Sequence, residues 1–415
     1  MTDYKKRLGT AIATVAILAQ SYSGLAFAGT TININGNAAD SDNDAVINNT
    51  QTTNISQNNT ANFTNYVDAD ADTGDNDANK NNGGDVSIET GDASVNVSVS
   101  NSANQNWAEV DCCNQGDTEV KIAGNGFDSN NTVNLDVDNK VKVDQDNDAD
   151  FHNYIKDIDA ETGNNDANKN NGGDVTIETG DASVTVAVSN WANANSARVG
   201  SGDGDGSSLS LKILDNAADS DNDIVVDVYS KTKVYQDNYA DFYNKVDADA
   251  DTGDNDANKN NGGNVSIDTG DAEVDVTVDN LANFNWADVN CGCVFGDGGL
   301  EVLVEGNGFD SNNTVNGDFD SIQKIDQDND ADFDNKVKNT DADTGNNDAN
   351  KNNSGGNGDP SIETGDADVD VNVSNSANVN GVGGDGPDWE WPEWNWGGLN
   401  ISLSFDLGDL LDALL

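Results

Sequence analysis

Basic side chains are scarce in this sequence of 415 residues: 19 Lys and Arg stand against 76 Asp and Glu, and the formal charge is −57. Such a surplus of negative charge repels the phosphates that dominate affinity for nucleic acids, so no nucleic-acid partner is expected. Proline is nearly absent, with 3 residues, whereas Asn, Asp and the 42 Gly are residues of tight turns. This composition predicts many short strands joined by many turns. A regular alternation of Val, Ile and Phe with polar residues argues against a disordered chain.

Catalytic motifs are also missing. The sequence contains no GxSxG, HExxH or Walker-type loop. The single histidine, His152, has no counterpart in the other repeats described below, so we expect it on the surface. A pair of carboxylates could hydrolyse glycosides, but four nearly identical repeats favour a structural material over one active site. We therefore expect no enzymatic activity.

Long apolar runs are missing beyond the N-terminus. Basic residues at Lys5–Arg7 precede an apolar stretch that extends to Leu18, and Ala26–Ala28 offers small residues for cleavage. This arrangement is typical of a secretory signal peptide. An N-terminal anchor helix is the alternative, but polar residues within Gln20–Ser23 interrupt the apolar run. We predict a signal peptide over residues 1–28, a secreted chain at the cell surface or outside the cell, and no transmembrane segment in the mature chain.

The remaining apolar residues alternate with polar ones over long tracts. In Ile224–Thr252 no residue at an even position is charged, while Asp, Lys, Tyr and one Val fill the positions between. The tract Ala45–Thr73 has the same alternation, in which odd positions are the uncharged ones up to Ala71. Period two predicts β-structure with one buried and one solvent face. A straight strand of this length would span roughly 95 Å, so we expect each tract to fold back or turn corners.

The chain consists of four repeats. The string TGDNDANKNNGGDVSIETGDASV begins at Thr73 and returns in closely similar form at Thr162, Thr252 and Thr344. Each copy then ends in a second alternating run. We divide the chain into repeat 1 (29–116), repeat 2 (117–206), repeat 3 (207–297), repeat 4 (298–384) and a C-terminal segment (385–415).

Odd and even repeats differ. The first and third open with AADSDND, and the second and fourth with NGFDSNNTVN. The even repeats also hold one more residue before the Thr-Gly step, and one extra residue in a period-two tract turns every later side chain to the other face. We therefore predict a β-bulge near Ile155–Ile158 and Val337–Thr340. The unit of design is a pair of repeats used twice.

Two architectures fit these repeats. In a β-solenoid, each repeat would contribute several coils with corners at DADADTGDND, NKNNGG and ETGD, and inward Gln236, Asn238 and Asn244 would stack in ladders. In a tandem array, each repeat would be one β-sandwich of about 90 residues. Inward amides favour the solenoid, because an unpaired amide in a small core costs about 1–3 kcal/mol. The repeat length favours the sandwich. We predict an all-β, solenoid-like repeat rod, with tandem sandwiches as the alternative.

Aspartates at alternate positions flank the Thr-Gly step. Alternation places the first three of each set on the outer face, about 6.6–7 Å apart along the strand, and a turn at Gly74 or Gly253 could bring the later pair to join them. Calcium takes such oxygen ligands, which predicts calcium binding by Asp68, Asp70, Asp72, Asp75 and Asp77, and by Asp247, Asp249, Asp251, Asp254 and Asp256. The alternative is a solvated acidic face with Asx-turns in a salt-adapted protein, since the EF-hand and calcium-binding nonapeptide patterns are absent.

Four cysteines occupy equivalent places in the two pairs of repeats: Cys112, Cys113, Cys291 and Cys293. An exported chain lies in an oxidising compartment, which predicts disulfides. Adjacent cysteines rarely bond to each other, so Cys112 and Cys113 would pair with Cys291 and Cys293, within or between molecules. A metal cluster is the alternative, but it lacks CxxC spacing.

The C-terminal segment differs from the repeats. It is rich in tryptophan and then alternates apolar residues: Trp389, Trp391, Trp394, Trp396, Leu399, Ile401, Leu403, Phe405 and Leu407. One interpretation is a cap, because the terminal repeats of a solenoid need distinct ends. A second is self-association, in which an apolar strand adds to the sheet edge of a neighbour. A third is contact between the tryptophans and carbohydrate or lipid headgroups.

The pattern TGDNDANKNNGGDVSIETGDASVNVSVSN, which follows a QxNxAxFxN tract, resembles uncharacterised secreted Asn/Asp/Gly-rich tandem-repeat surface proteins of uncultivated bacteria. The resemblance covers residue 29 to about residue 384. The steps Gln57-x-Asn59-x-Ala61 and Gln236-x-Asn238-x-Ala240 are also similar, more loosely, to curlin-type repeats, although the repeat here is much longer and more acidic.

These observations lead to one functional expectation. We predict a secreted structural repeat protein of the cell surface or extracellular matrix, a fibre subunit or adhesin with a calcium-stabilised acidic face. Its partners would be other copies of the chain or other surface components. The alternative is a calcium-dependent carbohydrate-binding adhesin that uses its Trp-rich tail to bind glycans.

Overall fold

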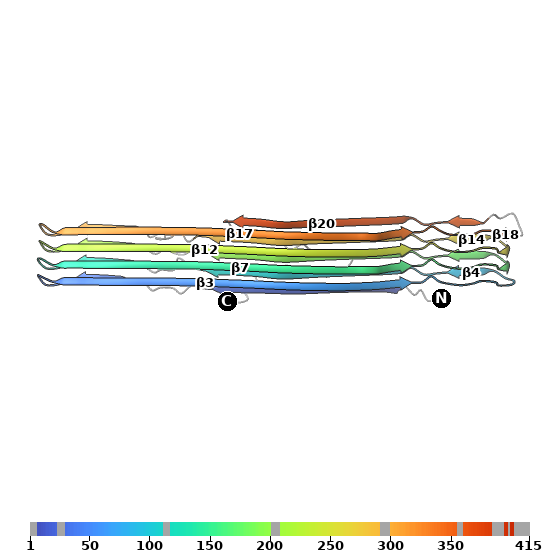
Figure 1. Ribbon diagram of the computed structural model, residues 1–415, viewed down its shortest axis with the longest axis horizontal. Coiled ribbons are helices and arrows are strands. Elements are labelled where there is room, and N and C mark those ends of the chain that lie inside the picture. Colours follow the sequence, from blue (N-terminus) through green and yellow to red (C-terminus); the bar gives the residue numbers. More distant parts are fainter. Residues whose placement is uncertain are drawn as a thin grey trace.

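The computed structural model of the chain describes residues 6–22, 30–110, 117–200, 208–290, 299–354, 360–383, 394–396 and 399–401, and every regular element in these residues is a β-strand (Figure 1). The four repeats form four stacked coils, which we call coil 1 (30–110), coil 2 (117–200), coil 3 (208–290) and coil 4 (299–383). Coil 1 consists of β2 (Thr31–Asn35), β3 (Asp42–Asp72), β4 (Val86–Glu89) and β5 (Ala93–Val110).

The other three coils repeat this order and add one short strand at the turn. Their strands are β6 (Thr118–Ala123), β7 (Asn130–Glu161), β8 (Asn171–Gly172), β9 (Val175–Glu178) and β10 (Ala182–Val199) in coil 2; β11 (Leu209–Leu214), β12 (Asp221–Asp251), β13 (Asn261–Gly262), β14 (Val265–Asp268) and β15 (Ala272–Val289) in coil 3; and β16 (Leu300–Glu305), β17 (Asn312–Asp343), β18 (Asn353–Ser354), β19 (Ser361–Glu363) and β20 (Ala367–Val382) in coil 4.

Each strand pairs in parallel with the same strand of the next coil. The long strands form one sheet in the order β17-β12-β7-β3, and the returning strands form a second in the order β5-β10-β15-β20. The register brings identical residues together, so that Phe63, Phe151, Phe242 and Phe333 lie in one column. Between the long strands and the returning strands, Val67 and Val95 belong to one apolar cluster of the core. Between the long strands and the sheet of β2, β6, β11 and β16, Ile34 and Leu135 belong to another.

The alternation predicted from the sequence is confirmed. The even residues of β12 point inward over most of its length, and Phe242 and Val246 are fully buried. The prediction that these tracts fold back is wrong: β3 and β12 each run straight for 31 residues. Because a complete neighbouring strand pairs with them along almost their whole length, no corner is needed to satisfy their backbone groups.

Each repeat therefore contributes one coil, not several, and the tract forms one long strand, not many short ones. The corners do lie in the predicted segments, DADADTGDND, NKNNGG and ETGD, between β3 and β5 and their equivalents. The solenoid is only four coils deep, and the longest dimension of the molecule follows the strands (Figure 1).

The predicted bulges are confirmed. In coil 2 the register shifts between Ile155 and Ile158, opposite Val67 and Ala69 of coil 1, and Asp157 has a positive φ of 52°. Asn339 of coil 4 has the corresponding φ of 49°. The bulge returns the following side chains to the inward face, where Ile158 is fully buried.

The predicted amide ladders are also confirmed, and they run through the whole stack. Asn59 Nδ2 donates to Asn147 Oδ1 at 3.0 Å, Asn147 donates to Asn238 at 3.0 Å, and Asn238 donates to Asn329 at 2.9 Å. A facing ladder from the returning strands interleaves with this one, for example through Asn147 Nδ2 and Asn195 Oδ1 at 2.8 Å. A second pair of ladders has the same plan and contains Asn65, Asn153, Asn244 and Asn335 facing Asn101, Asn190, Asn280 and Asn375.

A glutamine ladder runs in the opposite direction. Gln145 Nε2 donates to Gln57 Oε1 at 2.7 Å, Gln236 donates to Gln145 at 2.8 Å, and Gln327 donates to Gln236 at 2.7 Å. Each glutamine also donates to a carbonyl of the returning strand, as Gln236 does to the Trp286 carbonyl at 2.8 Å. Buried amides are thus hydrogen-bonded across the two layers, which removes the desolvation cost of burying them.

Glycine in the Thr-Gly step is required by stacking. A Cβ on Gly74 would lie 2.0 Å from the Gly163 carbonyl oxygen, and a Cβ on Gly163 would lie 2.0 Å from that of Gly253. The backbones of successive coils therefore approach too closely for any side chain, so the turn can stack only with glycine at this position.

Three described strands lie outside the coils. β1 (Lys6–Tyr22) pairs in parallel with β5, on the side of coil 1 that is turned away from coil 2. It belongs to the segment that we predict to be a signal peptide. β21 (Trp394–Trp396) and β22 (Leu399–Ile401) pair antiparallel with each other and form a separate two-stranded sheet.

Candidate functional site

Acidic columns mark the end of each long strand. Asp70, Asp159, Asp249 and Asp341 occupy one column of the long-strand sheet, and Asp72, Glu161, Asp251 and Asp343 occupy another. Asp68 and Asp70 are exposed between buried Val67, Ala69 and Ala71. The first three aspartates of each predicted set thus face outward, as expected, and stacking places carboxylates of four coils next to one another.

Partial burial and neighbouring negative charges raise the pKa of carboxyl groups in both columns. Partial burial, followed by the negative charges of Asp159 and Asp341, raises the pKa of Asp249 to about 6. Partial burial, followed by the charges of Asp72 and Asp251, raises the pKa of Glu161 to about 7. Ionising the carboxyl groups of both columns is therefore unfavourable in the folded chain, and a bound cation would favour their ionised form.

Some of the same carboxylates accept hydrogen bonds from the backbone of the turn that follows the long strand. Asp72 accepts a hydrogen bond from the Gly74 N–H at 2.6 Å, and Asp251 accepts one from the Gly253 N–H at 2.6 Å. These are Asx-turns, the feature that the alternative interpretation of the acidic face predicted. One oxygen of each carboxylate is thereby held by the backbone.

The later aspartates of each set lie in the turn. Asp75 and Asp254 have positive φ angles of 57° and 53°, and Asp77 is the first member of a bridged column that continues through Asp166, Asp256 and Asp348. Asp254 is close enough to contribute to the raised pKa of Asp251, although burial is the largest cause. Within the described part of the chain, no group of three or more His, Cys, Asp or Glu side chains is placed to hold a metal ion. Calcium binding stays a prediction, and its chemistry would fit these oxygen donors as a shared surface, not as a preformed cage.

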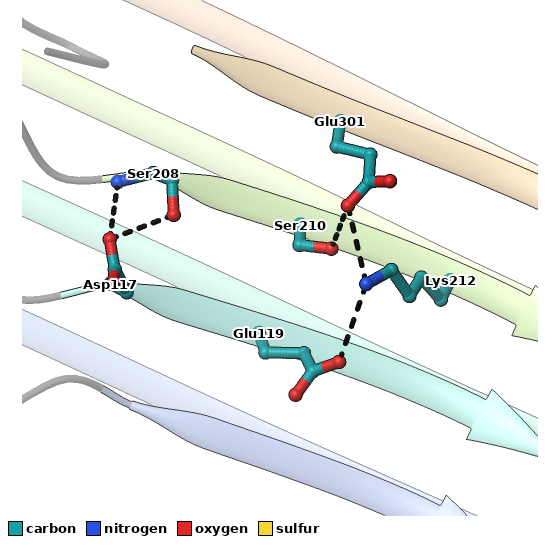
Figure 2. Close-up of polar contacts among 6 residues, drawn as sticks. All are labelled: Asp117, Glu119, Ser208, Ser210, Lys212 and Glu301. Carbon is teal, nitrogen blue, oxygen red and sulfur yellow. Dashed lines mark hydrogen bonds and ion pairs between the residues drawn. The ribbon is translucent and has the colours of Figure 1, made fainter. Parts of the chain in front are cut away.

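One basic side chain, that of Lys212, lies between acidic side chains of two neighbouring strands. Lys212 Nζ of β11 lies 3.2 Å from Glu301 of coil 4 and 3.6 Å from Glu119 of coil 2 (Figure 2). Ser210 Oγ donates to Glu301 at 2.8 Å. Hydrogen bonding to Glu301 raises the pKa of Lys212, and hydrogen bonds from Ser210 and then Lys212 lower the pKa of Glu301.

A second polar contact links coils 2 and 3 at the start of the same sheet. Asp117 accepts hydrogen bonds from the Ser208 backbone N–H at 2.9 Å and from the Ser208 hydroxyl at 2.8 Å (Figure 2). The backbone bond, followed by the hydroxyl bond, lowers the pKa of Asp117. Outer side chains of neighbouring coils are thus joined by hydrogen bonds and by ion pairs of opposite charge.

His152 lies on the outer face, as predicted. Its Nε2 lies 2.7 Å from Asp150 Oδ1, and its ring contacts Tyr154 and Tyr243. In coils 1, 3 and 4 the same column contains Thr64, Tyr243 and Asp334.

Several predicted residues lie outside the described part of the chain. These are Cys112, Cys113, Cys291 and Cys293 among the disulfide candidates, and Trp389, Trp391, Leu403, Phe405 and Leu407 of the tail. Trp394 and Trp396 lie in β21, and Leu399 and Ile401 lie in β22.

The sequence interpretation missed the open face of coil 4, by which we mean its side turned away from coil 3. Val371 and Val373 there are 42% and 41% exposed, whereas the paired Val276 and Val278 of coil 3 are fully buried. Apolar residues of β16, β19 and β20 that pair with buried residues of coil 3 contribute to the same face: Leu300, Val302, Val304, Ile362, Val369, Val379 and Val382. A signal in the sequence could have revealed this face. Repeat 4 has the same inward apolar residues as the other repeats, but residues 385–415, and not another repeat, follow it.

Comparison with known proteins adds no relationship. No family model, no curated protein and no solved structure matches this chain. Among the described residues there is no helix with the length and hydrophobicity to cross a membrane.

Proposed function

We propose that this chain is an exported structural element of the cell surface or extracellular matrix, acting as a fibre subunit or adhesin. The stack itself carries the proposal: four coils repeat the same strands in register, and amide ladders join all four coils. A framework in which each coil is bonded to its neighbours along strands of 31 or 32 residues supplies stiffness. The acidic outer face would keep this framework hydrated.

Calcium is proposed to stabilise the acidic columns. Supporting this part are the raised pKa values of Asp249 and Glu161, which reflect first partial burial and then the charges of neighbouring carboxylates. A divalent cation shared between neighbouring carboxylates would offset their repulsion in the folded chain and would have no equivalent site in the unfolded chain.

A melting curve measured with calcium and with a chelator tests this part. We expect calcium to raise the melting temperature more than magnesium at equal ionic strength. Glu161→Gln together with Asp249→Asn should shrink the calcium effect. Ser210→Ala, which changes a residue far from these columns, is the matched control and should leave the effect intact. Superimposed curves with calcium and chelator would contradict calcium stabilisation.

Export is tested by the position and the N-terminus of the protein. We expect the chain outside the cytoplasm, cleaved after Ala28. An uncleaved chain that stays in the cytoplasm of its native cell would contradict the proposed location, whatever its assembly state.

The alternative adhesin function depends on the Trp-rich tail. Deleting Trp389–Leu415 separates the possibilities: loss of glycan binding with unchanged assembly would support a carbohydrate-binding adhesin. Loss of assembly would instead assign the tail a role in self-association.

A further inference from the structure

Each end of the stack has a coil with a neighbouring coil on one side only. The open face of coil 4 exposes Val371 and Val373, and an apolar surface of this extent marks an interaction site. Coil 1 has a corresponding open face, on the side turned away from coil 2, of which β1 covers the β5 edge. We propose that the open face of coil 4 binds the open face of coil 1 in a second copy of this chain, so that molecules stack head to tail into a fibre. This inference rests on the proposed structural function and names its partner and surfaces.

Because odd and even coils alternate, the proposed junction between coil 4 and coil 1 of the second copy is equivalent to the contact between coils 2 and 3. Coil 4 is an even coil with a bulge at Asn339, and coil 1 is an odd coil without a bulge. Coil 2, with its bulge at Asp157, and coil 3, without one, form the same combination. The proposed junction therefore repeats the contact between coils 2 and 3. It would place Phe333 on Phe63 of the second copy, as Phe151 stacks on Phe242 with ring centroids 4.8 Å apart.

The hydrogen-bonding groups left at the two ends are complementary. In coil 4, Nδ2 of Asn375, Asn378 and Asn380 donates to no group in the described part of the chain, whereas the equivalent nitrogens in coil 3 donate to coil 4. In coil 1, Oδ1 of Asn59 and Asn65 accepts nothing among the described residues, although the equivalent oxygens of coils 2, 3 and 4 all accept.

The glutamine ladder has the opposite direction and is complementary as well. Within the described residues, Gln57 donates only to the Trp107 carbonyl, whereas the equivalent Gln145 and Gln236 each donate also to the preceding coil. Gln327 Oε1 receives no donor in the described chain. A second copy placed head to tail would complete every ladder, whereas head-to-head or tail-to-tail pairing would oppose donor to donor or acceptor to acceptor.

The charge of coil 1 also suits it for this contact. The stretch Ala45–Val67 of β3 contains no charged residue, whereas the paired stretch of β17, Val315–Val337, contains seven aspartates and two lysines. Outward Thr60 and Asn62 of coil 1 would lie beside Asp330 and Asp332 of the next molecule. The uncharged strand thereby avoids the like-charge repulsion that a second acidic edge would create.

The tail of the same chain is a poorer occupant of the coil 4 face. The described tail strands β21 and β22 pair with each other and not with β17 or β20.

The N-terminal strand bears directly on the junction. β1 pairs with β5 in parallel from Lys6–Ala93 to Tyr22–Val110, the position that β20 of a second copy would take. Cleavage after Ala28 would remove β1 and complete the open face of coil 1. The full chain should therefore assemble less than the chain cleaved after Ala28.

Electron microscopy and sedimentation of both forms test the proposal. We expect fibres of the cleaved chain with a strand spacing of about 4.8 Å along the axis and a molecular repeat of roughly 19 Å, four strand spacings. A cleaved chain that stays monomeric at high concentration would overturn the stacking. Equal assembly of the full chain would overturn the role of β1.

Two substitutions locate the interface. A Cβ on Gly253 would lie 2.2 Å from the Gly345 carbonyl oxygen, but a Cβ on Gly345 meets nothing nearer than Asp343 Oδ1 at 3.1 Å. Gly345→Ala should fold and melt like the parent chain, yet block assembly at the Gly74 carbonyl side of the next molecule. Val373→Asp should also block it, and the control Asn372→Asp, on the opposite side of β20, should not. Fibres formed equally well by Gly345→Ala and Val373→Asp would place the interface elsewhere and overturn the proposal.

A cross-link fixes the register and direction. Thr60, Asp148, Tyr239 and Asp330 form one column, so the junction pairs Asp330 with Thr60 of the second copy. A mixture of the Thr60→Cys and Asp330→Cys chains should form a disulfide between peptides containing positions 60 and 330, identified by mass spectrometry. Asp318→Cys, about 40 Å away along the strand, should not replace Asp330→Cys. Preferential 60–60 or 330–330 bonds would contradict head-to-tail stacking. Surface location and calcium-dependent melting are measured independently, so they can hold even when assembly fails.

Discussion

Phe151 of coil 2 and Phe242 of coil 3 stack face to face at the centre of the molecule, with ring centroids 4.8 Å apart and ring planes 2° from parallel. Both side chains are fully buried. Their column lies between the two pairs of asparagine ladders along the strands, so apolar and polar layers alternate within one core. The stability of the stack should therefore depend on both kinds of layer.

The aromatic column gives the first prediction. Phe242→Asp should lower the free energy of unfolding by at least about 4 kcal/mol, because losing a buried Phe costs about 3–5 kcal/mol and the buried carboxylate adds to this. Asp241→Ser, on the outer face of the same strand, should be close to neutral, since burial and then Asp150 and Asp332 already raise the pKa of Asp241. Denaturant unfolding of both variants checks the assignment of faces, and equal losses would contradict it.

The amide ladders give the second prediction. Asn147 donates to Asn195 and Asn238 and accepts from Asn59 and Asn106. Asn147→Ala leaves these partners without a bond in the core and should cost about 3 kcal/mol. Asn134→Ala, on the outer side of the same strand, should change stability by less than about 0.5 kcal/mol. Urea unfolding and amide hydrogen exchange measure the difference, and similar losses in both would show that the ladder does not stabilise the stack.

The dependence of stability on pH gives the third prediction. The pKa of Glu161 is raised to about 7 in the folded chain, so between pH 4.5 and 7 the folded state binds more protons than the unfolded state. Stability contributed by this group is therefore greatest below pH 4.5 and falls as the pH rises towards 7. Asp249, with a pKa of about 6, acts in the same direction. We expect a higher melting temperature at pH 5 than at pH 7.5 without divalent cations, and a smaller difference in Glu161→Gln. A melting temperature that rises over this interval, or an unchanged difference in the variant, would contradict the crowding of charge.

Glycine in the turns gives the fourth prediction. Gly163→Ala should destabilise the isolated molecule strongly, because the added Cβ would lie 2.0 Å from the Gly253 carbonyl oxygen. The same change at Gly345 should leave the melting temperature of the isolated molecule nearly unchanged. Thermal melts of the two variants under conditions that prevent assembly make the comparison. A large loss at Gly345 would show that the turn itself, and not stacking, requires glycine.

The sequence pattern predicts which side chains are buried and where the bulges lie. Alternation placed Phe242 and Gln236 inside, and one extra residue in the even repeats located the bulges at Asp157 and Asn339. Strand length was not predictable from this pattern, because period two is the same in a straight strand and in one that turns a corner. The 31 residues of β12 stay extended because β7 and β17 pair with it along almost its full length. This pairing cannot be predicted from the sequence of β12 alone.

The candidate site was predictable to a lesser degree. The outward position of Asp68, Asp70 and Asp72 followed from alternation, but stacking with Asp159, Glu161, Asp249 and Asp251 depends on the register between coils. Exposure of Val371 and Val373 could not be predicted from local sequence, since the same valines are buried in coils 2 and 3. Burial in a repeat structure depends on which coil ends the stack.

Every ladder bond joins residues far apart in the chain: Asn59 and Asn147 are 88 positions apart, and Asn147 and Asn238 are 91. A nascent chain leaving the ribosome or a translocation channel cannot close one inter-coil bond until the second repeat has emerged. Contacts of such long range also make folding slow. Under the export proposed above, a chain that crosses a membrane before its second repeat has emerged would still be extended, and the stack would acquire its rigidity only on the far side.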